Sequence, residues 1–420
     1  MSDRPGPLWP LMLPSDHRED DGLCAVSAQG VRVRFADGSE RLCGTSGLWN
    51  CILGYGNHAI AQAAADALRD ASYLSVWGYE NSYARRAAAA LVDLAGPHHF
   101  GRVLFSTSGG SANDLVMKLA RHYQALRGEH RRKGVIGLEG GYHGLTFGAF
   151  ALTTARLGQQ MYGVDRRMVA HVPPNDPEKL DALLTKHTGQ IAAVVVEPVI
   201  GTAAVPLTES YVAELLRLRG EHGFLLVADE VSTGFARIGP MFATHDWPEP
   251  PDIMITAKGL TNGTSAASAV IVSRAVADTF SEAGAVLAHA ETQAGTPIVG
   301  ASIMAMIEEM RRLDAMALSR RLSVRLDEGL SRLVDQEPLV SATTGKGCLR
   351  SLRLRGPDGE PLSPTEVPAV VAAIREAGAL VHPGPSCVQL LPALVYGDDD
   401  LDELLERVSA GLAEYKRTAA

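Results

Sequence analysis

The chain lacks the features that mark secreted, membrane-spanning and nucleic-acid-binding proteins. Cysteine is scarce, with 5 in 420 residues, and no pair has the CxxC spacing typical of redox or zinc sites. No apolar run has the length of a membrane span or of a signal peptide. Positive charge does not predominate, because 39 Lys and Arg against 48 Asp and Glu give a formal net charge of -9. We therefore expect a cytoplasmic protein without a metal site and without membrane or nucleic acid as partners.

The composition is that of a globular chain, with 46% hydrophobic and 21% charged residues. A length of 420 residues suffices for two domains that share an extensive core. Residues 1–50 are predicted to be irregular and extended, because Pro7, Pro10 and Pro14 disfavour a helix, with a small β unit near 31–35. Two alanine-rich segments, 59–71 and 83–94, have helical spacing.

From about residue 100, short apolar runs alternate with helix-length segments. The runs lie at 102–105, 134–138, 192–196, 224–227, 253–256 and 269–272. Such Val/Ile/Leu runs are typical of strands covered on both faces, and their alternation with helices predicts right-handed βαβ crossovers. Predicted helices at 297–313, 320–333, 364–377 and 400–415, with strands at 347–354 and 388–391, form a second α/β unit.

Distinctive polar residues follow four of these runs. The run at 102–105 leads into a Ser/Gly-rich loop. The runs at 192–196, 224–227 and 253–256 are followed by Glu197, Asp229 and Lys258, respectively. Ligands of parallel sheets bind outside the carboxyl ends of the strands, so we expect these groups to meet at one edge. In the loop, Gly109 and Gly110 would let backbone N–H groups approach a phosphate at a helix N-terminus. The alternative is a tight turn only, and the spacing does not match the G-x-G-x-x-G turn of NAD-binding folds.

Lys258 and Asp229 are the candidates for chemistry at this edge. A lysine drawn into such a site has a lowered pKa, and its amine can attack a carbonyl group. A carboxylate at Asp229 could keep the pyridine nitrogen of a cofactor protonated. The alternatives are a surface lysine at a strand end and, for Asp229, a helix cap or a structural ion pair.

Together these segments resemble one family, the class III (omega-type) aminotransferases of the fold-type I pyridoxal phosphate (PLP) enzymes. The resemblance is carried by SGGSAND at 108–114, GYHG at 141–144, VEPVIG at 196–201, DEVSTGFAR at 229–237 and AKGLTNG at 257–263. GLW at 47–49 and GYGNH at 54–58 resemble the N-terminal segment of the family. The matches follow the order of the family over nearly the whole chain.

The resemblance implies an α/β fold in which a large PLP-binding domain, residues 51–289, carries a mostly parallel seven-stranded sheet. Residues 1–50 would join a smaller α/β domain formed by residues 290–420. It also implies a homodimer with active sites at the subunit interface. The activity would be transfer of an amino group from an amine or amino acid to an aldehyde, ketone or keto acid, with ping-pong kinetics.

The resemblance also assigns roles to single residues. Lys258 would form a Schiff base with PLP and carry the proton, and Asp229 would pair with the pyridinium nitrogen. Tyr142 would stack on the ring, with Val231 on the opposite face. The other implied cofactor-binding positions are Gly109, Gly110, Glu197 near the cofactor, and Thr292 from the other subunit. His143 invites a role as a general base, but the resemblance makes it a supporting neighbour of Tyr142.

The substrate side departs from the family pattern. Trp49 matches a position that shapes the pocket, whereas Trp9 could line the entrance or pack at an interface. Ser111 replaces a usual Glu, and the segment around Thr292 matches only loosely. Gln389 stands where many members carry an Arg that grips an α-carboxylate by two hydrogen bonds. We therefore hypothesise an amine, aldehyde, ketone or unusual intermediate as substrate.

The same scaffold hosts other reactions, which the motifs separate poorly. An aminomutase, a racemase, a decarboxylating transaminase or an ammonia-phospholyase would use Lys258 and Asp229 equally. Exchange of amino groups between two different molecules would distinguish transfer from these routes. A catalytically silent binding scaffold is a further alternative, which a cofactor absorbance band removed by Lys258→Ala would exclude.

Overall fold

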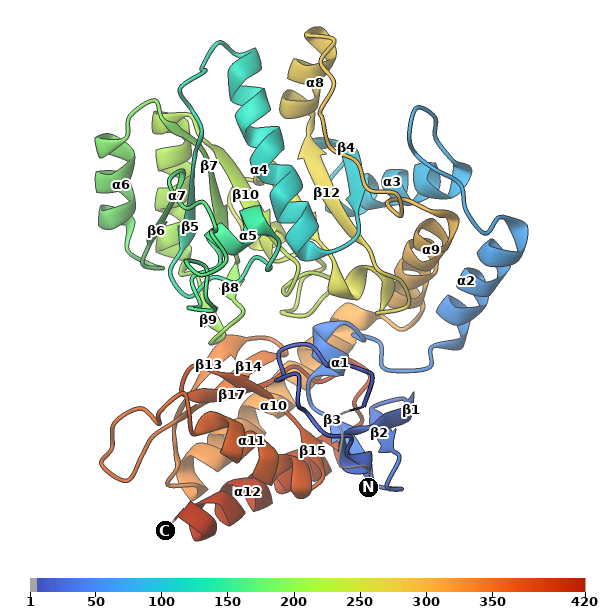
Figure 1. The fold of residues 1–420 in the computed structure, drawn as a ribbon, viewed down its shortest axis with the longest axis vertical. Coiled ribbons are helices and arrows are strands. Elements are labelled where there is room, and N and C mark those ends of the chain that lie inside the picture. The colour runs from blue at the N-terminus through green and yellow to red at the C-terminus, as the bar shows by residue number, and fades with distance from the viewer. Residues whose placement is uncertain (1–5, 420) are drawn as a thin grey trace.

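The computed structural model describes residues 6–419, so the first five residues of the predicted N-terminal segment lie outside it. Two lobes are stacked along the long axis of the molecule (Figure 1). A seven-stranded sheet forms the core of the upper lobe in the order β4-β12-β11-β10-β7-β5-β6. Its strands are β4 (Phe100–Ser106), β12 (Ser268–Ser273), β11 (Ile253–Thr256), β10 (Leu225–Asp229), β7 (Ile191–Val196), β5 (Gly134–Leu138) and β6 (Val169–Val172). This is the mostly parallel α/β sheet that the resemblance implies.

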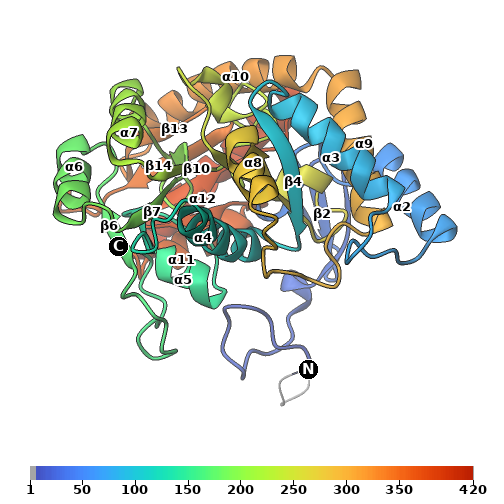
Figure 2. The same ribbon diagram turned by 90° about the horizontal axis from the view of Figure 1, so that it is seen from above.

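Alternate residues of each strand face opposite helical layers, because side chains of a strand point to opposite faces. In β7, Val195 packs with α4 (Gly109–Leu126), whereas Val194 packs with α6 (Pro177–Lys186) and α7 (Glu209–His222). Figure 2 shows α6 and α7 at one end of the sheet and α2 (His58–Asp70), α3 (Ser82–Ala95) and α9 (Pro297–Arg312) at the other. Both faces are therefore covered, as the uninterrupted apolar runs predict.

One predicted connection is wrong. The apolar run at 269–272 is a strand, but β12 pairs antiparallel with both β11 and β4, so no βαβ crossover leads into it. The chain reverses instead through the 3₁₀ helix η3 (Lys258–Thr261) and the residues that follow it. The apolar run could not reveal this, because a strand buried on both faces has the same composition in either direction.

The lower lobe holds a second sheet in the order β13-β14-β17-β16. Its strands are β13 (Val340–Lys346), β14 (Leu349–Leu354), β17 (Cys387–Leu390) and β16 (His382–Gly384). The helices α10 (Ala315–Gln336), α11 (Val367–Glu376) and α12 (Asp398–Ala419) accompany it. A third sheet joins the two ends of the chain, because β15 (Ala379–Leu380) pairs parallel with β3 (Glu40–Cys43). The N-terminal strands β1 (Ala25–Gln29) and β2 (Arg32–Phe35) complete that sheet.

The remaining elements are short, apart from α8. They are η1 (Asp21–Leu23), α1 (Ser46–Trp49), α5 (Phe147–Leu152), β8 (Val199–Ile200), β9 (Val205–Pro206), η2 (Ala243–Asp246) and α8 (Arg274–Glu282). Helix α9 packs on α2 and α3 in the upper lobe, although the predicted boundary at residue 290 assigns it to the smaller domain. No helix within residues 6–419 is both long and apolar enough to cross a membrane.

Candidate active site

A cavity of about 570 Å³ opens beyond the carboxyl ends of β4, β10 and β11. Three of the four groups predicted to converge line this cavity, namely the Gly109–Gly110 turn, Asp229 and Lys258, and Tyr142 joins them, whereas Glu197 is not among the lining residues. Val231 lines it as well. A cavity of this size is within the range that holds cofactors and small substrates.

One end of the cavity is the N-terminus of α4. Ser108 caps the helix, since its Oγ accepts a hydrogen bond from the backbone N–H of Ser111 at 3.1 Å. The first N–H groups of a helix have no partner within it, so those of Gly109 and Gly110 are available to an anion. Gly144 packs backbone to backbone on this turn, because a Cβ atom there would lie 2.4 Å from Gly110 Cα. Glycine at these positions therefore leaves a shallow cradle with the character of a phosphate site.

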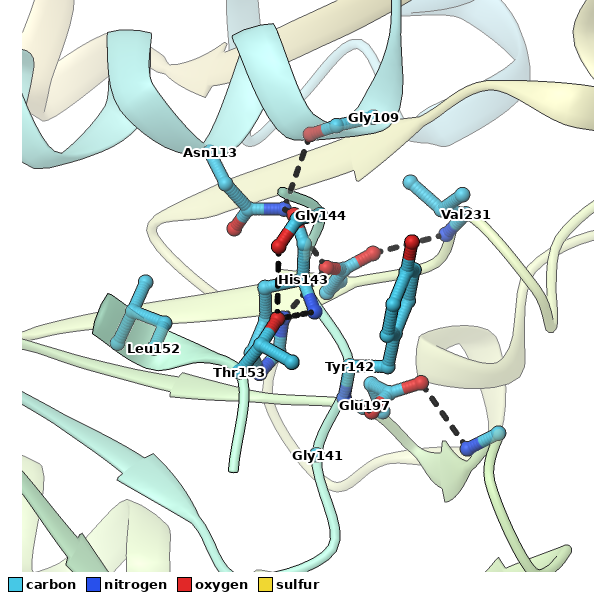
Figure 3. A network of polar contacts seen from close by, with 12 residues as sticks. Gly109, Asn113, Gly141, Tyr142, His143, Gly144, Leu152, Thr153, Glu197 and Val231 are labelled. Atoms are coloured by element: carbon cyan, nitrogen blue, oxygen red, sulfur yellow. Dashed lines mark hydrogen bonds and ion pairs between the residues drawn. The ribbon is translucent and has the colours of Figure 1, made fainter. Parts of the chain in front are cut away.

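Asp229 forms the centre of a buried polar network, and its partners Asn113, His143 and Val231 are labelled in Figure 3. Its Oδ2 accepts hydrogen bonds from His143 Nδ1 at 2.7 Å and from Asn113 Nδ2 at 2.9 Å. Its Oδ1 accepts one from the backbone N–H of Val231 at 3.2 Å. Thr153 Oγ1 in turn accepts the backbone N–H of His143 at 3.0 Å. The carboxylate is thus fixed in orientation, and His143 supports Asp229 rather than facing Lys258.

Charge is retained in this network despite its burial. Burial alone would raise the pKa of Asp229, but the hydrogen bond and charge of His143, together with Asn113, lower it. Burial opposes the charged form of His143 too, but its hydrogen bond to Asp229 and the charge of that carboxylate raise the pKa of His143. The pair therefore holds an ionised carboxylate at the base of the cavity at neutral pH.

Lys258 begins η3 in a left-handed conformation, with φ of 40°, directly after β11. Its Nζ donates a hydrogen bond to Ser232 Oγ at 2.8 Å and lies 4.3 Å from the centre of the Trp49 ring. Burial lowers the pKa of Lys258 to about 8, although the charges of Asp229 and Glu197 oppose this. At pH 7 a pKa of about 8 leaves roughly one lysine in ten as the neutral, nucleophilic amine, far more than for an ordinary lysine.

Glu197 follows β7 and fixes two loops beside the cavity. Its carboxylate accepts the backbone N–H of Tyr142 at 2.9 Å and that of Gly201 at 3.0 Å. Burial raises the pKa of Glu197 to about 7. The ring of Tyr142 is 42% exposed, so one face of it is free to form a wall of the cavity.

The structure does not bring every predicted residue to this cavity. Thr292 lines a separate cavity with Tyr73 and Trp77, and its carbonyl accepts the Tyr73 hydroxyl. Trp9 is 67% exposed and donates its indole N–H to the Leu13 carbonyl within its own loop. Gln389 is buried in β17, with its amide Nε2 bonded to the Gly201 carbonyl.

Three further residues belong to the site that sequence reasoning gave no role. Asn113 orients Asp229, and Ser232 contacts Lys258. His382 packs edge-on against Trp49, with ring centres 5.7 Å apart. Asn113 and Ser232 lie inside the recognised motifs, so their position was a usable signal, whereas His382 carries no local signature. Within residues 6–419, no group of three or more His, Cys, Asp or Glu could hold a metal ion.

The residues present fit PLP. The cavity offers an anion site at the start of α4, an ionised carboxylate at Asp229, an aromatic wall at Tyr142 and an amine at Lys258. These groups match the phosphate, the pyridine nitrogen, the ring and the aldehyde of that cofactor. Strands β10 and β11 are neighbours and run parallel, so Asp229 at the end of one and Lys258 after the other lie at the same edge of the sheet.

Comparison with known proteins gives a consistent answer. The family model described as aminotransferase class-III matches residues 15–412. An omega-aminotransferase of Caulobacter vibrioides is 28% identical and an acetylornithine aminotransferase of Mycolicibacterium smegmatis is 31% identical, with 97% and 93% of both chains covered. An amine transaminase from an uncultivated Pseudomonas species, solved with PLP bound, has a TM-score of 0.91 at 26% identity, covering 98% of this chain and 100% of that one. The predicted family and fold are confirmed: the chain belongs to the class III aminotransferases and is a PLP-dependent enzyme that transfers amino groups.

Proposed function

We propose that Lys258 binds PLP covalently through Nζ and that the enzyme transfers an amino group from an amine donor to a carbonyl acceptor in two half-reactions. The observation that supports this is the convergence of the Lys258 amine, the Asp229 carboxylate and the α4 N-terminus on one cavity. When bound, PLP supplies a protonated ring that withdraws electrons from the carbon bearing the transferred nitrogen.

The residues of the chain then have separate tasks. Asp229 keeps its negative charge beside the ring nitrogen, because His143 and Asn113 hold it ionised and oriented. Gly109 and Gly110 hold the phosphate through backbone N–H groups. Lys258 Nζ accepts a proton from the substrate carbon in one half-reaction and returns one in the other, with Ser232 orienting the amine.

Two residues line the ring position from opposite sides. Tyr142 and Val231 form the walls between which the ring fits, and Tyr142 stacking contributes about 0.5–1.5 kcal/mol beyond area burial. Glu197 holds the Tyr142 loop by its backbone rather than by a contact to substrate. The tasks of Tyr142 and Glu197 are thus to orient rather than to react.

We further propose a cytoplasmic homodimer in which Thr292 of one subunit completes the phosphate site of the other. Thr292 lies outside the cavity of its own chain. Exposed apolar side chains line the same cavity as Thr292, including Trp77 at 75% and Val76 at 38%. The division into residues 1–50, 51–289 and 290–420 remains part of this proposal, with the pairing of β15 and β3 supporting the union of the first and last segments.

Exchange of nitrogen between two molecules tests the function. Holoenzyme given a ¹⁵N-labelled amine donor and an unlabelled carbonyl acceptor should yield ¹⁵N in the acceptor product, with parallel double-reciprocal plots. Label that stays in the donor skeleton, or that appears as free ammonia, would instead indicate a mutase, racemase or lyase. Light scattering on the same preparation should give twice the 44.6 kDa of one chain.

The substrate side has little to bind a carboxylate. Gln389 is tied to Gly201, and His382 lies opposite Gln389 in the pairing of β16 with β17. Burial and then the charge of Lys258 lower the pKa of His382, so its imidazole is neutral at neutral pH. A carboxylate beside Gln389 and His382 would lose its hydration without gaining a charged hydrogen-bond donor from either residue. We therefore propose a donor or acceptor whose reacting carbon carries no carboxylate.

Gln389→Arg is expected to shift this preference. A guanidinium at this position offers two charge-assisted hydrogen bonds, worth about 1.5–3 kcal/mol, and so about 10- to 100-fold in kcat/KM for α-amino acids relative to simple amines. The measurement is kcat/KM for alanine or glutamate against an amine lacking a carboxylate. Gln389→Met serves as the matched control, because it removes the amide without adding charge. Equal effects of both variants on both substrate types would refute the idea.

A further inference from the structure

The turn that carries Trp49 has an unusual backbone. Ser46, Gly47, Leu48 and Trp49 all have positive φ values, of 49°, 56°, 57° and 73°. A left-handed conformation costs a non-glycine residue roughly 1–2 kcal/mol, so Ser46, Leu48 and Trp49 need compensation from their surroundings. Contacts to other parts of the chain must hold this turn.

Arg237 supplies the central contact. Its Nη2 donates to Ser46 Oγ at 3.2 Å, and its Nη1 donates to the Pro392 carbonyl at 2.6 Å. Ser46 Oγ in turn donates to the Leu391 carbonyl. One guanidinium thus joins the segment after β10, the N-terminal turn and the end of β17.

Arg237 is unusual in its charge as well as in its contacts. It is 0% exposed, and within residues 6–419 no carboxylate forms an ion pair with it. Burial lowers the pKa of Arg237 to about 10, so it still carries a charge at neutral pH. An unpaired buried cation is costly, and hydrogen bonds to neutral oxygens compensate only part of that cost. Neutral hydrogen-bonding groups could connect these segments without that cost, so the charge at Arg237 points to a role beyond connecting them.

The held turn sets the position of the Trp49 ring. The ring packs against the cluster that contains Ile238 and Leu391, the neighbours of Arg237 and Pro392. Its other contacts are with Gly201, where a Cβ atom would lie 3.0 Å from the indole, and with His382. Its face lies beneath Lys258 Nζ at 4.3 Å. The indole therefore lies directly against the reactive amine.

We propose that Arg237 is a positioning residue of the active site: through Ser46 it fixes the left-handed turn and thereby the placement of Trp49 beside Lys258. The inference rests on the proposed role of Lys258. It extends that role, because the surroundings of the reactive amine are then set by Arg237, a buried residue that does not line the cavity. Arg237 also adds to the influences that lower the pKa of Lys258.

The test combines a double-mutant cycle with a direct report on the indole. Arg237→Met and Ser46→Ala holoenzymes are each prepared with and without Trp49→Phe. The fluorescence emission of Trp49 is the difference between the spectra with and without Trp49→Phe. Its maximum is expected to move to longer wavelength in both Arg237→Met and Ser46→Ala, because the indole becomes more exposed to water. A loss of roughly 10-fold in kcat/KM is expected for Arg237→Met, since a 1 Å misplacement costs up to about 10²-fold. This loss should largely disappear when Trp49 is already Phe.

Controls separate positioning from general damage. Arg274→Met is the matched control, because Arg274 also donates to a proline carbonyl, that of Pro97 at 2.8 Å, but far from the cavity. Arg237→Lys should restore part of the activity, since an ammonium provides charge without the planar fork. Ser46→Ala keeps the test decisive if Arg237→Met does not fold. Unchanged Trp49 emission in a folded variant, or additive losses in the cycle, would overturn the proposal. The measurement of Trp49 emission tests this proposal independently of the proposed function, because it does not depend on which PLP reaction the enzyme catalyses.

Discussion

Lys258→Ala is expected to lower the rate of amino transfer by at least about 10⁴-fold, because one change removes both the covalent attachment and the proton carrier. The visible absorbance band of the bound cofactor should shift or vanish, and PLP should dissociate on dialysis. Single-turnover kinetics with a saturating amine would measure the loss.

Borohydride reduction provides the matching chemical test for Lys258. Peptide mass mapping of the reduced wild-type enzyme should find the cofactor mass on the peptide that contains Lys258. Lys179→Ala is a suitable control, because the Lys179 side chain is exposed on α6 and forms an ion pair with Asp176. A label on another lysine, or full activity in Lys258→Ala, would contradict the assignment on which the proposed mechanism depends.

Asp229→Asn is expected to give the next largest effect, a loss of about 10²–10³-fold in the rate of the first half-reaction. A loss of this size is typical when one preorganised electrostatic group is removed from a buried active site. The side chain keeps its shape but loses the charge that His143 and Asn113 stabilise. The pKa of His143 should fall in the variant, because the hydrogen bond and charge of Asp229 are what raise it.

Asp252→Asn is the matched control for this substitution. Asp252 precedes β11 and accepts the backbone N–H of Leu226 at 2.8 Å, at the opposite edge of the sheet from the cavity. Its loss should affect thermal stability but leave the half-reaction rate within a few-fold of wild type. A folded Asp229→Asn enzyme that matches this control in rate would exclude an electrostatic role for Asp229.

Much of the upper lobe could be predicted because its physical causes are local. The apolar run that forms β7 is fully buried, and helix-length segments around it leave few topologies open. Strand β6 escaped prediction because it is a short edge strand with only Val172 fully buried. Strand β13 likewise has only one buried residue, Val340, so its sequence lacks the apolar signal.

The site was predictable to the extent that its residues stand directly at strand ends. Asp229 ends β10 and Lys258 follows β11, so both could be located before any contact was known. The contacts of Trp49 with Lys258 and His382 could not, because they join three segments far apart in the chain through a left-handed turn. Under the proposed dimer, Thr292 would act across the subunit interface, which no contact within one chain defines.

The pairing of β3 with β15 has a consequence for the order in which the chain folds. Leu42 pairs with Ala379, so β3, which is synthesised early, cannot form this pairing until β15 is synthesised near the end of the chain. At about 5–20 residues per second, the roughly 340 residues between them take on the order of 20–70 s to emerge from a ribosome. During that interval one edge of β3 has no backbone partner, and such an edge can pair with other nascent chains. Because a higher level of synthesis multiplies such unpaired edges, we expect the demand for chaperones at the first fifty residues to rise with the expression level.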